Sequence, residues 1–265
     1  MDIAKPDHAA PSCGIAIMAK ASVPGRAKTR LVPPLTFAEA AAFNSAFLKD
    51  VAANVLAAAD GADIAGYVAY GPPGADAVAF FQRLLPRRIG LIEAWFPNFG
   101  DCLFSAVAQL LDRGHASAVV LNSDSPTLPT SLLIETACVL AQPGDRAVLG
   151  PSIDGGYYLL GVKQPHRRLF EDVAWSTEQV ARQTLERAAE IGLRVHVLQP
   201  WYDVDDVEAL NTLRSEVCED AAFSASLDPH RAIYSEGLLR ALLAGADLAR
   251  RLAIASGADA VRAAE

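Results

Sequence analysis

Asp124 stands where a predicted buried strand gives way to a polar loop. The apolar run 118–121 is followed by the polar stretch 122–125 and by Pro126. Ligands of open α/β sheets bind beyond the carboxyl ends of the strands, and Mg²⁺ prefers one or two carboxylates together with water and substrate phosphates. Asp124 is therefore a candidate catalytic residue and metal ligand, and Ser125 is a candidate substrate contact. A simple turn that begins the next helix explains the same residues equally well.

A cluster of positive charge follows the first predicted strand, residues 13–19. Lysine binds phosphate as a point charge and arginine as a planar fork, so the cluster predicts a phosphate site, and Lys28 is also a catalytic candidate. Gly25 permits a tight turn that would bring the backbone close to a ligand. The loop has no Walker motif, and a solvated basic loop that binds nothing is the alternative. The four cations are Lys20, Arg26, Lys28 and Arg30.

Asp154, Gly155 and Gly156 form a predicted turn between two strands. Glycines in such positions let a backbone approach a sugar or phosphate closely, so both glycines are candidate substrate contacts. The Asp154 carboxylate is a candidate catalytic residue that could orient a hydroxyl or act as a base. An ordinary hairpin turn uses the same residue types, so this motif alone is a weak indication.

Three carboxylates lie between a late predicted strand and a helix, at Asp203, Asp205 and Asp206. Asp203 and Asp205 are two residues apart, and an extended backbone would point both side chains the same way. Either one could supply a second metal carboxylate opposite Asp124. Asp206 is placed to cap the following helix, and an acidic helix start is the alternative interpretation of the whole cluster.

Alternating strand and helix patterns predict an α/β domain over residues 13–219, with a mainly parallel mixed sheet flanked by helices. The Asp-Gly-Gly turn indicates one antiparallel insertion, and residues 1–12 are expected to be a flexible leader. The predicted strands are 13–19, 64–70, 89–95, 118–121, 147–149, 157–162 and 195–198. The predicted helices are 36–59, 75–85, 102–111, 132–140, 177–191 and 207–217.

Residues 220–265 predict a helical C-terminal extension, because the composition changes to Ala, Leu and Arg. We expect one amphipathic helix within 228–265 that packs on the domain or on a partner subunit in a homodimer. Its apolar stripe would comprise Leu238, Leu242, Ala246, Ala249 and Leu252.

The composition argues against several classes of function. A net charge of −8 disfavours general nucleic-acid binding, and no apolar run is long enough to span a membrane. The four cysteines are scattered and form no CxxC pair, which is typical of a cytoplasmic protein with small buried cysteines. The aromatic residues are interpreted as core. We therefore expect a cytoplasmic protein that binds neither nucleic acid nor membrane.

Taken in order, five motifs between Gly14 and Leu213 resemble a known family. They are AKASVPGRAKTRL, LNSDSPTLP, LGPSIDGGYYLLG, AWSTEQV and YDVDDVEAL. The set is similar to an incompletely characterised GT-A-like transferase family of the nucleotide-diphospho-sugar transferase superfamily, whose members are labelled as glycosyltransferases associated with radical-SAM or arsenosugar loci. The Lys-Thr-Arg-Leu segment is also similar to that of phospholactate guanylyltransferases, which transfer a nucleotide instead of a sugar.

The resemblance implies a Rossmann-like GT-A fold that uses Mg²⁺ (or Mn²⁺), a nucleotide or nucleotide sugar and a small-molecule acceptor. It assigns Lys28 and Arg30 to the donor phosphates and Asp124 to the ion. Asp203 or Asp205 would be the second metal contact, and the turn at 154–156 would lie near the second substrate.

One segment departs from the family pattern. After Asp101 the family usually continues Leu-Gly-Glu-Arg, whereas this chain reads Cys102-Leu103-Phe104-Ser105. If the missing charged pair contacts substrate, this chain has a different acceptor or reduced activity.

These observations favour a Mg²⁺-dependent glycosyltransferase with a nucleotide-sugar donor. A nucleotidyltransferase that couples a nucleoside triphosphate to a small phosphorylated substrate, with release of pyrophosphate, is the second hypothesis. A catalytically silent nucleotide-binding protein is the third. Both transferase hypotheses require Lys28 and Arg30 to lie near Asp124 in the folded chain.

Overall fold

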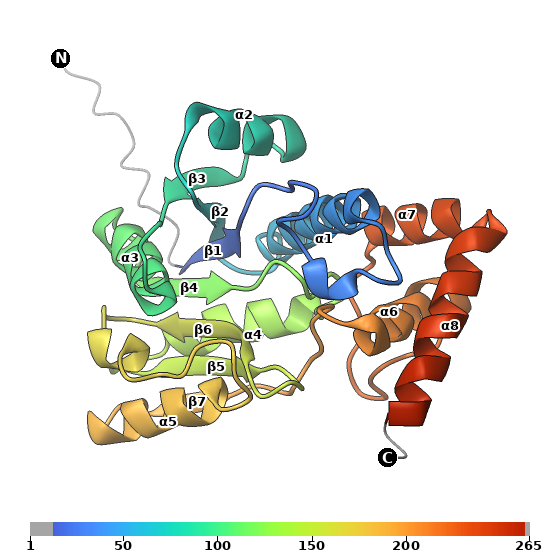
Figure 1. The fold of residues 1–265 in the computed structure, drawn as a ribbon. Coiled ribbons are helices and arrows are strands. Elements are labelled where there is room, and N and C mark those ends of the chain that lie inside the picture. The colour runs from blue at the N-terminus through green and yellow to red at the C-terminus, as the bar shows by residue number, and fades with distance from the viewer. Residues whose placement is uncertain (1–12, 263–265) are drawn as a thin grey trace.

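A seven-stranded mixed sheet lies at the centre of the molecule (Figure 1), whose computed structural model describes residues 13–262. The strands are β1 (Cys13–Ala19), β2 (Ile64–Tyr70), β3 (Gly90–Glu93), β4 (Ser117–Leu121), β5 (Ala147–Pro151), β6 (Tyr157–Val162) and β7 (Val195–Val197). Their order is β3-β2-β1-β4-β6-β5-β7. Only β6 runs antiparallel to its neighbours, β4 and β5. The predicted mainly parallel sheet with one antiparallel insertion is therefore confirmed.

Helices cover both faces of this sheet. They are α1 (Phe37–Ala58), α2 (Ala75–Leu84), α3 (Phe99–Asp112), α4 (Thr130–Ala141), α5 (Val180–Glu190), α6 (Val207–Glu219), α7 (Ile233–Leu243) and α8 (Ala246–Arg262), with short 3₁₀ turns η1 (Thr29–Leu31) and η2 (Arg167–Phe170). Successive side chains of a strand point to opposite faces. In β1, Ile15 and Ile17 pack in the core formed with α1 and α4, and Ala16 packs in the core formed with α3 and η2. Burial on both faces explains why the strands are continuous apolar runs.

Helix α1 begins with a capping box, whose sequence signature is Thr36 followed by Glu39 three residues later. The Thr36 hydroxyl accepts the Glu39 backbone N–H at 3.2 Å, and the Glu39 carboxylate accepts the Thr36 backbone N–H at 2.7 Å. Phe43 and Phe47, which lie four residues apart on one face of the helix, are fully buried. The cap fixes where the helix starts, and therefore where the cationic loop before it must end.

The C-terminal extension is two helices, so the prediction of a single helix over 228–265 was wrong. Helix α7 ends before Gly245, a poor helix former, and α8 starts in a new direction (Figure 1). The break changes which residues face the core. Leu248 and Leu252 are buried, whereas Ala246 and Ala249 of the predicted stripe are exposed. Helix α7 packs on α1 and α6, and α8 packs on α6 and α7, as the domain-packing alternative expected.

A buried carboxylate on α1 anchors α7. Asp50 accepts the backbone N–H groups of Tyr234 at 3.0 Å and Ser235 at 2.8 Å, together with the Ser235 hydroxyl at 2.5 Å. The first N–H groups of a helix have no partner within the helix. Asp50 therefore caps α7 from another element, with a negative charge at the favourable end of the helix dipole.

Helix α8 is fastened to the segment that follows the cationic loop. The Arg251 guanidinium forms a forked ion pair with both oxygens of Glu39, at 2.8 and 2.9 Å. The same guanidinium donates to the Pro34 carbonyl. Arg251 thus joins the C-terminal extension to the start of α1, close in sequence to Lys28 and Arg30.

Across residues 13–262, no helix is both long enough and apolar enough to cross a membrane. The predicted leader, residues 1–12, lies outside the described part of the chain.

We predict that Asp50→Ala lowers the free energy of unfolding by about 2 kcal/mol, because three donors at the start of α7 lose their acceptor. Urea unfolding measures the loss. Asp50→Asn, which keeps one acceptor oxygen, should lose less. The exposed Asp112→Ala on α3 is the control, and an equal loss in both alanine variants would contradict the anchoring role.

Candidate active site at the carboxyl ends of the strands

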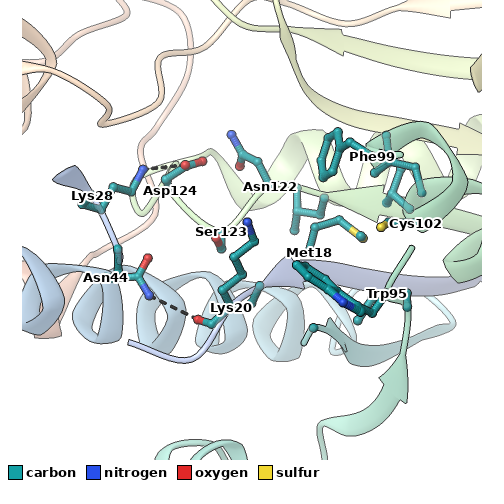
Figure 2. A pocket seen from close by; sticks show the side chains of 18 of the residues that line it. Met18, Lys20, Lys28, Asn44, Trp95, Phe99, Cys102, Asn122, Ser123 and Asp124 are labelled. Carbon is teal, nitrogen blue, oxygen red and sulfur yellow. Dashed lines mark hydrogen bonds and ion pairs between the residues drawn. The ribbon is translucent and has the colours of Figure 1, made fainter. Parts of the chain in front are cut away.

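A cleft of about 510 Å³ opens beyond the carboxyl ends of β1–β4 (Figure 2). The strand order reverses between β1 and β4, and such a switch point is where open α/β folds bind their ligands. The cleft has two parts of different character. Its charged end comprises Arg26, Lys28, Arg30, Asp124 and Asp205. Its aromatic end comprises Trp95, Phe96, Phe99 and Tyr157.

Lys28 is the centre of the charged end. Its Nζ lies 2.5 Å from Asp124 Oδ2 and 2.5 Å from Asp205 Oδ1, and Figure 2 shows Lys28 and Asp124 pointing toward one another. Arg30 Nη1 lies 3.7 Å from Asp205 Oδ2. Lys28 therefore lies beside Asp124, as both transferase hypotheses require, and Arg30 lies beside Asp205. One cation and two carboxylates meet here from three distant parts of the chain.

The local backbone explains why Lys28 points inward. Lys28 adopts a left-handed conformation, with φ of 50°, just before η1, and Leu31 in that turn is fully buried. Only 7% of the Lys28 side chain is exposed. Burial by itself lowers the pKa of Lys28, but the negative charges of Asp124 and Asp205 outweigh burial and raise the pKa above its ordinary value. Lys28 is therefore a permanent cation at neutral pH.

The two acidic loops are tied to each other by the backbone and by a buried polar network. The Val204 N–H donates to the Asp124 carbonyl at 2.9 Å. The Tyr202 hydroxyl donates to Glu216 at 2.6 Å and accepts from the Thr127 hydroxyl at 2.9 Å. These contacts hold the loop of Asp205 against the loop of Asp124.

Asp206 plays the predicted structural role. Its carboxylate accepts the Ala209 N–H at 2.8 Å and so caps α6. Capping fixes the start of α6 directly after Asp203 and Asp205. Of these two predicted metal ligands, Asp205 lines the cleft and Asp203 does not.

Negative charge is concentrated around Asp203. Burial raises the pKa of Asp203, and the charges of Asp124, Asp154 and Asp205 raise it further, to about 8. Lys28 opposes this shift only in part. At neutral pH the Asp203 carboxyl is therefore largely protonated, and the ion pairs of Lys28 are those with Asp124 and Asp205.

A divalent cation fits this donor set. Asp124 Oδ1 is buried and has no hydrogen-bond partner within the described part of the chain, an arrangement that costs free energy unless a donor or a cation reaches the oxygen. Among residues 13–262, no three His, Cys, Asp or Glu side chains are grouped closely enough to hold an ion by themselves. Water or substrate phosphate would therefore have to complete the coordination shell, which is the usual arrangement for Mg²⁺.

The aromatic end corrects the interpretation of the aromatic residues as core. Trp95, Phe96 and Phe99 are 44%, 45% and 50% exposed and line the cleft. Lys20 extends over the Trp95 ring, with Nζ 5.6 Å from its centroid. Trp95 and Phe96 follow β3 as Asp124 follows β4. The strand-end argument that selected Asp124 would have found these residues too.

The expected phosphate-binding cations all line the cleft, namely Lys20, Arg26, Lys28 and Arg30. Gly25 does not line it. Gly25 has φ of 77°, and a Cβ atom at this position would meet nothing within 4 Å. Its function in the loop is therefore the turn itself, and the expected close approach to a ligand is not seen.

Ser125 lies outside the cleft, contrary to its expected role as a substrate contact. It is 1% exposed, and its hydroxyl accepts from the Asn122 amide at 3.0 Å. Of the two serines in this loop, Ser123 is the one that lines the cleft. Sequence reasoning missed Ser123, Asn122 and Asn44, which line the cleft. A polar loop after a strand does not show which of its side chains point into the cleft and which are buried in the protein.

The turn at 154–156 forms a separate shallow hollow with Glu178, Gln179 and Arg182. Gly155 has φ of 88°, and a Cβ atom there would lie 2.1 Å from the Glu178 carbonyl oxygen. Its missing side chain therefore serves packing against the segment before α5. The Gly156 N–H donates to the Asp154 carboxylate at 2.9 Å. Asp154 therefore lines this hollow and not the cleft, and neither glycine lines the cleft.

The segment that departs from the family pattern belongs to α3, which begins earlier than predicted because Asn98 caps it. Cys102 and Leu103 are buried beneath the aromatic end. The Phe96 N–H donates to Cys102 Sγ at 3.2 Å, and the Phe104 ring packs against Phe170. Apolar packing therefore replaces the charged pair of the family in this wall.

Part of the chain matches a protein-family model. Residues 52–177 match the family described as an uncharacterized protein conserved in bacteria (DUF2064). The matched range includes Asp124 and Asp154 but ends before Asp205 and starts after Lys28. No curated protein matches the sequence.

Solved structures share the fold. A protein from Desulfovibrio desulfuricans G20, provisionally named a nucleotide-diphospho-sugar transferase, is 25% identical, with a TM-score of 0.76 over 91% of this chain and 98% of that one. CMP:2-keto-3-deoxy-manno-octonic acid synthetase in complex with CTP is 12% identical, with a TM-score of 0.51 over 79% and 99%. The 4-diphosphocytidyl-2C-methyl-D-erythritol synthase of Anaerococcus prevotii DSM 20548 is 9% identical, with a TM-score of 0.50 over 77% and 97%. The Rossmann-like α/β fold expected from the sequence is thus confirmed.

We predict that Gly155→Ala destabilises the chain by about 3 kcal/mol, because the new Cβ adds a clash with the Glu178 backbone to the cost of a left-handed residue. Gly25→Ala shares the left-handed conformation but has open space, so it should cost only about 1 kcal/mol. Chemical denaturation of both variants measures the difference. Equal losses would show that the contact with Glu178 has no effect.

We predict that Tyr202→Phe lowers the free energy of unfolding by about 1–3 kcal/mol, because Glu216 loses its hydroxyl donor in a buried place. Tyr234→Phe removes an exposed hydroxyl from α7 and is the matched control. If thermal and urea unfolding of the two variants coincide, the buried network does not hold the two acidic loops together.

Proposed function

We propose that the chain is a Mg²⁺-dependent transferase that takes a nucleotide sugar as donor and a small molecule as acceptor. The observation that carries this proposal is the convergence of Lys28, Asp124 and Asp205 at the switch point of the sheet. Carboxylates for a cation and cations for phosphate are the groups that a metal–diphosphate complex needs. The name of the Desulfovibrio protein, which shares the fold along nearly its whole length, supports the same class.

The donor phosphates would lie along the charged end of the cleft. Lys28 and Arg30 would neutralise the leaving diphosphate, and Arg26 and Lys20, which line the same cleft, would add positive charge along its wall. Asp124 and Asp205 would hold the cation. When bound, Mg²⁺ or Mn²⁺ would neutralise part of the charge that develops on the departing diphosphate. Positioning and charge neutralisation by fixed groups of this kind are large contributions to transferase catalysis.

The aromatic end suits a nucleobase. Trp95, Phe96 and Phe99 present apolar ring surface to solvent in the cleft wall, and nucleobases stack on such rings. A nucleotide lying with its base here and its phosphates at the charged end would use both parts of the cleft. This fit supports a nucleotide over a simple sugar phosphate.

The acceptor would approach from the side of Asp154 and Asp203. In glycosyl transfer an acceptor hydroxyl attacks the anomeric carbon, the bond to the diphosphate breaks, and a base takes the hydroxyl proton. Asp154 is exposed and lies near enough to Asp203 to influence its pKa, which makes Asp154 the candidate base. Carboxylates on this side favour an uncharged acceptor, because a phosphorylated one would be repelled.

Nucleotidyl transfer is the second candidate, and the four cations of the cleft favour it. In this reaction a substrate phosphate attacks the α-phosphate of a nucleoside triphosphate and pyrophosphate leaves. Lys20, Arg26, Lys28 and Arg30 supply more positive charge than a diphosphate requires. A nucleotide-binding protein without activity is the third candidate, for which the apolar wall at Cys102 and Leu103 is the supporting observation.

A panel of nucleoside triphosphates and nucleotide sugars, with and without Mg²⁺, identifies the donor by its thermal shift, since a bound ligand stabilises the folded state. Product analysis then distinguishes the reactions. Release of a nucleoside diphosphate from a nucleotide sugar supports glycosyl transfer, and release of pyrophosphate from a triphosphate contradicts it.

We predict that Asp124→Ala lowers kcat/KM roughly 100-fold or more, because the transition-state charge loses a fixed partner. Asp112→Ala, outside the cleft, should leave it unchanged. Tight nucleotide binding that is indifferent both to Mg²⁺ and to Asp124→Ala would instead support the protein without activity.

A further inference from the structure

In the structure the cation between Asp124 and Asp205 is a side chain of the protein, the Lys28 ammonium. The Lys28 ammonium contacts one oxygen of each carboxylate at 2.5 Å, and the Lys28 and Asp124 side chains are largely buried. The Arg30 guanidinium is farther away, at 3.7 Å from Asp205, and 69% exposed. Lys28 is therefore the principal counter-charge of the two carboxylates in the ligand-free chain.

A divalent ion cannot use these two oxygens while Lys28 stays in place. Mg²⁺ binds its ligands at about 2.0–2.1 Å. An ion bridging Asp124 Oδ2 and Asp205 Oδ1 would therefore overlap the ammonium, which already lies 2.5 Å from both atoms. The two cations exclude each other from this position.

Lys28 nevertheless does not satisfy the whole site. Asp124 Oδ1 is buried without a hydrogen-bond partner among the described residues, whereas Lys28 contacts only the other oxygen of that carboxylate. The buried ammonium carries one positive charge for the two carboxylates, and Arg30, the other cation beside them, is exposed. A doubly charged ion would balance this group better, provided that Lys28 has another anion to pair with.

The cleft offers that second place. Lys28 has a flexible four-carbon stem, and it lies in the same cleft wall as Arg26, Arg30 and Lys20. Donor phosphates drawn to these cations would supply the anion that Lys28 needs on leaving the carboxylates.

We infer that Lys28 is a built-in counter-ion that is exchanged for the donor's divalent cation. It holds Asp124 and Asp205 in the free protein, and it passes to the donor phosphates when the cation takes its position. This inference rests on the proposed function, because it takes Asp124 and Asp205 to be the carboxylates that hold the cation. It goes beyond that function in assigning Lys28 two successive partners.

The exchange predicts that the divalent cation binds weakly without the donor and much more tightly when the donor phosphates are present. Without donor phosphates, each cation that binds must leave Lys28 buried and unpaired. The apparent affinity for the free metal is then reduced by the small fraction of molecules in which Lys28 has withdrawn. Removing the Lys28 ammonium removes this competition. A variant without Lys28 should therefore bind the free metal more tightly, even though it binds the donor phosphates less well.

The test is Mn²⁺ binding to the full chain, measured by calorimetry and by the electron paramagnetic resonance signal of free Mn²⁺, with no nucleotide present. Lys28→Met should bind Mn²⁺ roughly tenfold or more tightly than the wild type. Asp124→Asn added to Lys28→Met should abolish the gain. Lys163→Met removes the same charge from a position just after β6, outside the cleft, and should bind Mn²⁺ as the wild type does.

Folding of the variants supplies a second readout. Lys28→Met leaves two close carboxylates without their cation, so its Tm should fall, and Mn²⁺ should restore it more than it raises the wild-type Tm. Lys28→Gln keeps a polar side chain with N–H donors and should show the same effects more mildly. It replaces Lys28→Met if the latter does not fold.

The exchange is wrong if the Lys28 variants bind Mn²⁺ no more tightly than the wild type. It is also wrong if the gain in Mn²⁺ affinity persists when Asp124→Asn is added. The proposed function is judged separately, by nucleotide binding to the wild type. If the wild type binds a nucleotide with Mg²⁺ but the Lys28 variants gain no affinity for Mn²⁺, the exchange is wrong and the transferase proposal stands. If no nucleotide binds, the transferase proposal fails as well.

Discussion

The ion pair network of Lys28 with Asp124 and Asp205 is the constraint on which the rest of the structure depends. Like charges repel strongly where water is scarce, so Asp124 and Asp205 can share a cleft only with a cation between them. In the free chain that cation is Lys28, held at 2.5 Å from each. The position of the loop after β1 is therefore fixed by charge as well as by packing.

The surrounding fold holds these charged side chains close together. The switch point brings the ends of β1 and β4 together, and the Val204 N–H joins the late acidic loop to Asp124. Helix α1 supports this arrangement from below the cleft, and the C-terminal helices are fastened to α1 through Asp50 and Arg251. The extension is thus part of the framework of the site, as well as an addition to the domain.

The cleft has one charged end and one aromatic end, and a ligand that fills it needs both kinds of contact. One end presents buried and exposed charge, and the other presents three exposed aromatic rings. A nucleotide has the same division, with a charged phosphate end and a flat apolar base. The apolar packing at Cys102 and Leu103 supports the ring-bearing end from beneath. The departure from the family pattern therefore lies at the aromatic end, away from the charged end.

The sequence by itself determined the order of strands and helices, the capping box of α1 and the chemistry of Asp124 and Lys28, because periodicity, caps and charge are local properties. It did not determine which side chains share a surface. Only the tertiary structure decided that Lys28 pairs with both carboxylates, that Ser125 is buried while Ser123 lines the cleft, and that Trp95 is exposed. These facts depend on contacts between segments far apart in the chain, for which local pattern carries no signal.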